Sequence, residues 1–172
     1  MSHITILQGD ITQARVDAIV NAANTQMLGG GGVDGAIHQA AGPTLLEECY
    51  KIEVVNGVRC PFGEARITRA GNLACKYVIH TVGPIYEITK NSSAVLSSAY
   101  ESSLQLAQRH HCTSIAFPAI SCGVYGYPID KAADIALNIC HQSKFDELNI
   151  IFYLFNQETY YAWQQVADRL NS

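Results

Sequence analysis

Short apolar runs rich in β-branched residues recur along the chain, separated by longer segments of helical periodicity. Residues 77–82 and 150–155 hardly alternate between apolar and polar positions, which is typical of strands buried on both faces of a mostly parallel sheet. The pattern predicts strands at His3–Gln8, Asp17–Ala22, Ala65–Arg69, Lys76–Val82, Ser114–Ala119 and Leu148–Phe155.

The segments between these strands have the spacing of amphipathic helices. Tyr160, Trp163 and Val166 fall on one face of the final segment. Pro43 is a favoured first residue of a helix. Helices are predicted at Val33–Ala41, Pro43–Val54, Ser92–His110, Pro128–Ser143 and Gln157–Leu170.

Strands alternate with helices, and no repeat or linker interrupts them. Residues 1–172 are therefore predicted to form a single α/β domain, a three-layer α/β/α sandwich with a mixed, mostly parallel central sheet. Ligands in such folds bind beyond the carboxyl ends of the strands, so the loops that follow strands are the places to look for a site.

The charge balance limits the classes of partner. Lys and Arg total 11, Asp and Glu total 15, and the formal net charge is −4. A duplex-DNA binder normally carries a basic surplus and a basic stripe. The sequence has neither, so nucleic-acid binding is disfavoured, whereas a local site for a small anion remains open.

The six cysteines form no C-x-x-C pair, and their spacing is irregular. Without a secretory leader or an apolar run of ~20 residues, we expect reduced thiols in a cytoplasmic protein that does not enter a membrane. His110–Cys112 and Cys140–His141 are the close groups of zinc-type ligands. Because neighbours in sequence point to different faces, we expect neither a metal site nor another cofactor.

The first candidate site is a glycine-rich loop after strand Asp17–Ala22. The four glycines Gly29–Gly32 precede a predicted helix at Val33, and such a run lets the backbone pass close to a ligand. At the helix start, exposed N–H groups and the helix dipole favour an anion. The alternative is a flexible surface turn.

A second loop, Pro118–Pro128, follows strand Ser114–Ala119. Gly123 and Gly126 permit a nest of backbone N–H groups, which is a second anion cradle. Tyr125 lies between them and would pack on a sugar or base, the alternative being an ordinary half-buried tyrosine. Since neither loop contains Lys or Arg, the two turns predict that backbone dipoles bind a ligand with two phosphates.

Two common nucleotide-binding motifs fit less well. The P-loop pattern ending in Gly-Lys-Ser/Thr is absent. Gly30–Gly35 satisfies G-x-G-x-x-G with Glu53 about twenty residues on, as in dinucleotide-binding folds. However, Asn24–Leu28 separate the glycines from the strand, and Asp34 would lie against the pyrophosphate. A Rossmann oxidoreductase is therefore disfavoured.

Three segments together resemble the macrodomain family of ADP-ribose-binding α/β/α modules. They are Val20–Asn24, Gly29–His38 and Ala119–Gly126, and the likeness extends from Gln8–Thr12 to the final strand. The combination is most similar to the MacroD-type branch and, within it, to the bacterial O-acetyl-ADP-ribose deacetylases. The resemblance implies a hydrolase that cleaves esters on the distal ribose of ADP-ribose, with O-acetyl-ADP-ribose and mono-ADP-ribosylated proteins as substrates.

The resemblance also implies which residues bind the ligand. Asp10 would accept a hydrogen bond from the adenine amino group, and the Ile11 N–H would contact the ring. Phe155 and Asn156 would border the adenine. The implied ligand-binding residues are Asp10, Ile11, Asn24, Gly31, Gly32, Val33, Asp34, Ser121, Cys122, Gly123, Val124, Tyr125, Phe155 and Asn156.

The resemblance places the diphosphate within Ser121–Tyr125 and the distal ribose beside Gly32–Asp34. Catalysis is assigned to Asp34 and Asn24. Asp34 would orient and activate the water that attacks the ester, and the helix start would keep its carboxylate ionised. Asn24 would fix the ribose hydroxyls. The alternatives are that Asp34 is only a helix N-cap and that Asn24 only stabilises its loop.

Other side chains leave further alternatives open. His38 lies four residues after Asp34 on the same helical face, where local packing is favoured over an acid–base role. His80 lies inside an apolar strand and is expected in the core. Cys122 replaces a frequent Thr of the family, and a thiol nucleophile with His80 as base is a less favoured mechanism. Gln39 replaces a frequent Arg.

Two other functions compete with ester hydrolysis. One is a non-catalytic reader that binds ADP-ribose without cleaving it, and the other is an interaction with RNA ends. Asn24 together with Asp34 beside the glycines favours an enzyme. The acidic net charge and the missing basic stripe argue against RNA.

Overall fold

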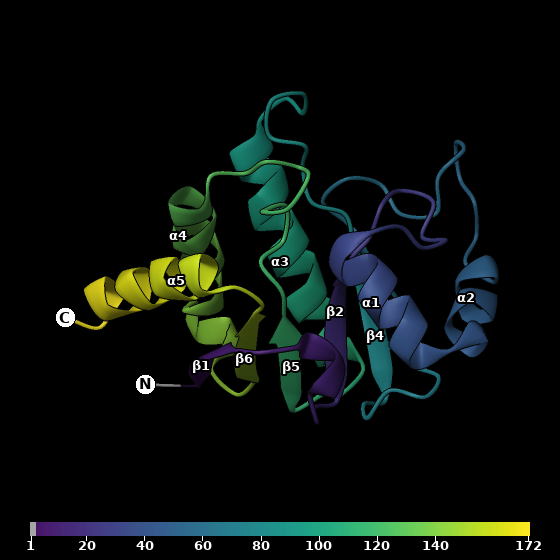
Figure 1. The fold of residues 1–172 in the computed structure, drawn as a ribbon, viewed down its shortest axis with the longest axis horizontal. Helices are drawn as coiled ribbons and strands as arrows, with labels where there is room; N and C mark the ends of the chain where they lie inside the picture. The colour runs from purple at the N-terminus through teal and green to yellow at the C-terminus, as the bar shows by residue number, and fades with distance from the viewer. Residues whose placement is uncertain (1–2) are drawn as a thin grey trace.

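Residues 3–172, the part of the chain described by the computed structural model, form a six-stranded sheet flanked by helices (Figure 1). The strands are β1 (Ile4–Gln8), β2 (Ala18–Ala22), β3 (Ala65–Arg69), β4 (Tyr77–Thr81), β5 (Ser114–Phe117) and β6 (Asn149–Leu154), in the spatial order β1-β6-β5-β2-β4-β3. Neighbours pair in parallel except β3 and β4, which pair antiparallel at one edge. The predicted mixed, mostly parallel sheet is confirmed.

Successive residues of the strands enter two separate apolar layers. On β2, Val20 packs with the layer that also contains Tyr100 and Trp163, whereas Ile19 packs with the layer that contains Ile37 and Leu45. This alternation follows from the two-residue period of a strand. The first layer lies under α3 (Ser92–Arg109), α4 (Ile129–Cys140) and α5 (Gln157–Leu170), and the second under α1 (Gly32–Ala41) and α2 (Pro43–Tyr50). The predicted three-layer sandwich is confirmed.

None of the helices within residues 3–172 is both long and apolar enough to cross a membrane.

Two predicted helices end earlier than the hydrophobic pattern indicates. The helix predicted at Pro43–Val54 ends at Tyr50, because Val55 and Val58 pair across a tight turn at Asn56–Gly57, where both residues have positive φ. Asn-Gly favours such turns. The helix predicted at Pro128–Ser143 ends at Cys140, and a short 3-10 helix, η2 (Ser143–Phe145), buries Phe145.

The 3-10 helix η1 (Ile11–Gln13) follows β1 and was not predicted. Its N-cap is Asp10, whose Oδ1 accepts hydrogen bonds from the Thr12 N–H at 2.9 Å and from the Thr12 hydroxyl at 2.7 Å. Ile11 is buried beneath it. This turn brings the chain from the end of β1 over the carboxyl edge of the sheet.

Candidate active site

A cavity of about 550 Å³ lies beyond the carboxyl ends of β1, β2, β5 and β6. This volume is within the range of small-molecule sites, ~300–1,000 Å³. All of the ligand-binding residues implied by the sequence line it: Asp10, Ile11, Asn24, Gly31, Gly32, Val33, Asp34, Ser121, Cys122, Gly123, Val124, Tyr125, Phe155 and Asn156. Within residues 3–172, no Lys, Arg or His side chain lines the cavity.

One wall of the cavity is the start of α1. Gly31 is the N-cap residue and has no side-chain cap, and Gly32 has φ +58°. The first N–H groups of a helix have no partner within the helix, so this end of α1 offers free amides and the positive end of a dipole. A Cβ atom at Gly35 would lie 2.6 Å from the Gly30 carbonyl oxygen. Glycine is therefore required there for the loop to fold back against α1.

The facing wall is the loop between β5 and α4. Ser121 has φ +68°, and its hydroxyl donates to the Pro84 carbonyl at 2.7 Å, while its own carbonyl accepts from the Tyr127 N–H at 2.9 Å. Within the described residues, the N–H groups of Gly123–Tyr125 make no backbone hydrogen bond. The loop is thus held at its base and presents unpaired amides at its tip, as an anion cradle requires.

The carboxylate of Asp34 lies between these walls with only 5% of the residue exposed. Its Oδ1 accepts a hydrogen bond from Asn21 Nδ2 at 2.9 Å, and Oδ2 lies beside Gly30 at the cavity wall. Burial raises the pKa of Asp34, while the Asn21 hydrogen bond and the charge of His38 lower it. Asp34 is the third residue of α1 and does not cap it. The helix N-cap interpretation of Asp34 is therefore wrong.

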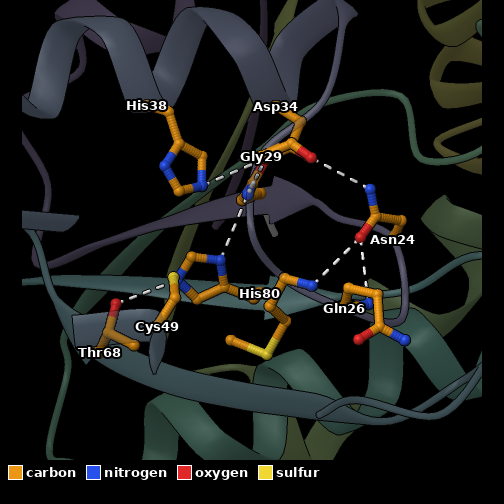
Figure 2. Close-up of polar contacts among 10 residues, drawn as sticks. Asn24, Gln26, Gly29, Asp34, His38, Cys49, Thr68 and His80 are labelled. Atoms are coloured by element: carbon orange, nitrogen blue, oxygen red, sulfur yellow. Dashed lines mark hydrogen bonds and ion pairs between the residues drawn. The ribbon is translucent and has the colours of Figure 1, made fainter. Parts of the chain in front are cut away.

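Asn24 stabilises its loop as well as lining the cavity. Its Oδ1 accepts from the N–H groups of Gln26 and Met27, both at 3.1 Å, and its Nδ2 donates to the Gly29 carbonyl at 3.2 Å (Figure 2). Asn24 therefore does stabilise its loop, but these hydrogen bonds do not show that this is its only role. Since the side-chain amide has a second N–H hydrogen, a contact to a ligand at the cavity wall remains available.

His38 and Gln39 lie outside this cavity and line a separate, shallower depression behind the glycine loop. His38 Nε2 is 3.5 Å from Asp34 Oδ1, whereas the other carboxylate oxygen, Oδ2, lies beside Gly30. His80 is fully buried, as predicted for a core residue, and burial lowers its pKa to about 3. His80 is therefore neutral at ordinary pH.

The thiol-nucleophile alternative has no support in the geometry. Burial raises the pKa of Cys122 to about 12, and a protonated thiol is a poor nucleophile. The hydrogen-bond partners of His80 are Asn21, Thr68 and Cys49, not Cys122. The Rossmann alternative also fails, because Glu53 follows the end of α2 and does not line the cavity.

Residues 20–136 match the family model for the Macro domain. The chain belongs to the macrodomain family. This macrodomain is 58% identical to a macro domain-containing protein of Vibrio parahaemolyticus, over 95% of this chain and 96% of that protein. It is 59% identical to an O-acetyl-ADP-ribose deacetylase of Citrobacter koseri, over 80% of this chain and 77% of that protein.

Solved structures agree with this assignment. The macrodomain of Oceanobacillus iheyensis with ADP superposes with a TM-score of 0.91 and 43% identity, over 96% of this chain and 90% of that one. The Trypanosoma brucei macrodomain in complex with ADP-ribose has a TM-score of 0.84 and 40% identity, over 96% and 69%.

Several residues that line the macrodomain's cavity were not predicted, among them Gly83, Tyr153 and Thr159. Gly83 is the second residue after β4, so the rule that ligands bind beyond strand ends would have found it. A Cβ atom there would collide with the side chain of Ser121. Tyr153 lies on β6 and Thr159 in the first turn of α5, and no motif marks either.

Proposed function

We propose that this macrodomain binds ADP-ribose in the cavity and hydrolyses an ester on its distal ribose. The observation that carries the proposal is a buried carboxylate, Asp34, at the place where two amide-lined turns face each other across one cavity. The deacetylase name of the Citrobacter koseri relative supports the same activity.

Binding is proposed to depend on backbone dipoles. The amides at the start of α1 and at the tip of Gly123–Tyr125 would hold the diphosphate, because a helix start and a nest of N–H groups both favour anions. Asp10 and Ile11 would meet the adenine near β1, with Phe155 and Asn156 at its border. In this arrangement the distal ribose would lie at the other end of the cavity, beside Asn24 and Asp34.

The reaction needs a nucleophilic water and stabilisation of the tetrahedral oxyanion. Asp34 would accept a proton from the water as its oxygen attacks the acyl carbon. The bond between that carbon and the ribose oxygen then breaks, Asp34 gives the proton to the leaving ribose oxygen, and a carboxylic acid and a free ribose hydroxyl result. Both O-acetyl-ADP-ribose and ADP-ribose esterified to Asp or Glu side chains of proteins are substrates of this class.

The test is incubation of the purified protein with O-acetyl-ADP-ribose, with acetate release followed by NMR and ADP-ribose binding followed by calorimetry. We expect turnover by the natural protein, and loss of turnover with retained binding for Asp34→Ala. Binding without acetate release would instead make the protein a reader.

A further inference from the structure

A row of four polar side chains lies buried between the sheet and α1. Thr68 on β3, His80 on β4 and Asn21 on β2 belong to neighbouring strands, and Asp34 on α1 faces Asn21. Thr68 Oγ1 is 3.0 Å from His80 Nε2, and His80 Nδ1 is 3.2 Å from Asn21 Nδ2. Asn21 and His80 are register partners on parallel strands. Figure 2 shows His80 between Asp34 and Thr68.

The donor and the acceptor of each hydrogen bond in this row are fixed. The Thr68 hydroxyl donates its hydrogen to the Arg69 carbonyl at 3.0 Å, so Oγ1 accepts from His80 Nε2–H. His80 Nδ1 then carries a lone pair and accepts one hydrogen of Asn21 Nδ2. The second Nδ2 hydrogen goes to Asp34 Oδ1 at 2.9 Å.

The reverse direction would damage the site. With the proton on Nδ1, His80 would present a donor to the Asn21 amide, which would then turn its oxygen toward Nδ1 and the carboxylate of Asp34. A buried carboxylate would lose its donor and face another oxygen, and both changes are costly in a poorly solvated site. Among residues 3–172, Asn21 Oδ1 has no partner, so the two Nδ2 bonds alone decide how the amide is turned.

We propose that His80 and Thr68 are positioning residues, which fix the orientation of the Asn21 amide and thereby hold the Asp34 carboxylate in its reactive orientation. This inference rests on the proposed function of Asp34. Neither His80 nor Thr68 lines the cavity, and they are 0% and 6% exposed. They therefore act only through Asn21.

Among residues 3–172, Asn21 is the one neutral side-chain donor to Asp34. The titratable groups around the carboxylate are His38 on α1, Tyr125 on the facing loop, Cys49 on α2, and His80 beyond Asn21. The thiol of Cys49 is also 3.8 Å from His80 Nε2. Burial raises the pKa of Cys49 to about 12, so it stays a protonated thiol and only a weak competitor of Thr68.

The direct test is ¹⁵N NMR of the histidine side chains in the natural protein, which needs neither turnover nor a variant that must stay active. The chain has six histidines, and the His80→Asn variant identifies the His80 signals by their loss. We expect the Nε2–H form, unchanged between about pH 5 and pH 9 because the buried ring stays neutral. An Nδ1–H form would overturn the proposal.

The second test compares two threonine variants. Thr81 is a matched control, because it is fully buried on β4 and donates to the Glu64 carbonyl at 2.8 Å, outside this row. Without the Thr68 acceptor the Asn21 amide is no longer held in place, so Thr68→Val should weaken its hydrogen bond to the buried Asp34 carboxylate. We expect this loss to lower kcat about tenfold and to move the acid limb of the pH profile upward. Neither side chain touches the ligand, so both variants should bind ADP-ribose within about twofold of the natural protein's affinity. The kcat of Thr81→Val should also stay within about twofold of the natural value. Equal losses of kcat, or none, would contradict the proposal.

A third comparison asks whether an acceptor for Asn21 is what matters at position 80. His80→Asn keeps a side-chain oxygen that can accept from Asn21, whereas His80→Leu removes it. We expect kcat to be higher for His80→Asn than for His80→Leu, and the opposite order would overturn the proposal. If the natural protein releases no acetate, the proposed function fails, whereas the NMR measurement still decides the direction of the row.

Discussion

His38 lies one helical turn after Asp34, with its Nε2 3.5 Å from Asp34 Oδ1. This imidazole lies near Oδ1 of the carboxylate, whereas Oδ2 lies beside Gly30, and the imidazole is outside the main cavity. When protonated, it stabilises the carboxylate by charge alone, because no hydrogen bond joins the two side chains within residues 3–172. Its effect on the site is therefore electrostatic.

The first prediction concerns this charge. Protonated His38 lowers the pKa of Asp34, so His38→Gln should raise it. Because the base must be ionised, the acid limb of kcat should move to higher pH in the variant. A pH–rate profile measures the shift, with His110→Gln at the end of α3 as a control that should leave the limb in place. An unmoved limb in His38→Gln would show that the imidazole does not act on Asp34.

The second prediction links Asp34 to stability. Burial raises its pKa in the folded protein above the ordinary 3.8, so the folded state holds this proton more tightly than the unfolded chain. Stability is therefore lost as pH rises from 3.8 through the folded pKa. The side chain that Asp34→Asn introduces has no carboxyl group to ionise, so this loss of stability should not occur in the variant. Its side-chain oxygen can still accept a hydrogen bond from Asn21.

We expect Asp34→Asn to abolish turnover and to have a Tm at pH 7 equal to or above that of the natural protein, with the advantage shrinking toward pH 4. Thermal unfolding over a pH series measures this. If Asp34→Asn instead lowers the Tm by the same amount at every pH, the ionised carboxylate does not destabilise the folded protein.

The third prediction contrasts two glycines of the first loop. A Cβ atom at Gly35 would meet the Gly30 carbonyl oxygen at 2.6 Å, whereas one at Gly31 would meet no atom of residues 3–172 within 4 Å. Gly35→Ala should lower the free energy of unfolding by about 1–3 kcal/mol, the usual cost of overpacking, and should weaken ADP-ribose binding. Gly31→Ala should change the free energy of unfolding by no more than ~0.5 kcal/mol. Denaturant titration tests both, and equal destabilisation would argue against the close approach at Gly35.

The fourth prediction concerns recognition of the base. If Asp10 accepts a hydrogen bond from the adenine amino group, the protein should bind ADP-ribose more tightly than its hypoxanthine analogue, which lacks that group. Asp10→Asn keeps an oxygen that can cap η1 but loses the charge, so it should reduce this preference. Calorimetric titration with both nucleotides is the measurement. Equal affinities in the natural protein would place the amino group elsewhere.

The loops of the site could be predicted from the sequence because their signals are local. Four consecutive glycines before a helix, and Gly123 and Gly126 after a strand, mark close backbone approaches whatever the rest of the chain does. Asp34 and Asn24 lie next to these glycines, and the family resemblance assigned their roles. In the structure Asn24 and Asp34 line one cavity together with Gly30, Gly31, Gly32 and Gly123, whereas Gly29 and Gly126 lie outside its lining.

The supporting row behind Asp34 could not be predicted in the same way. Asn21, Thr68 and His80 come from separate strands, and only the strand order and register bring them together. Buried residues on separate strands form no motif in the sequence, and His80 was expected only as a core residue. The antiparallel pairing of β3 with β4, by contrast, follows from their short connection, residues 70–76, because parallel neighbours need a crossover of about a dozen or more residues.

The central claim is that peptide amides, not cationic side chains, hold the diphosphate and place the distal ribose beside Asp34. A crystal structure of the protein soaked with ADP-ribose tests it most directly. The account predicts phosphate oxygens on the amides at the start of α1 and on those of Gly123–Tyr125, with the distal ribose against Asp34 and Asn24. A bound nucleotide that leaves both turns empty would contradict it.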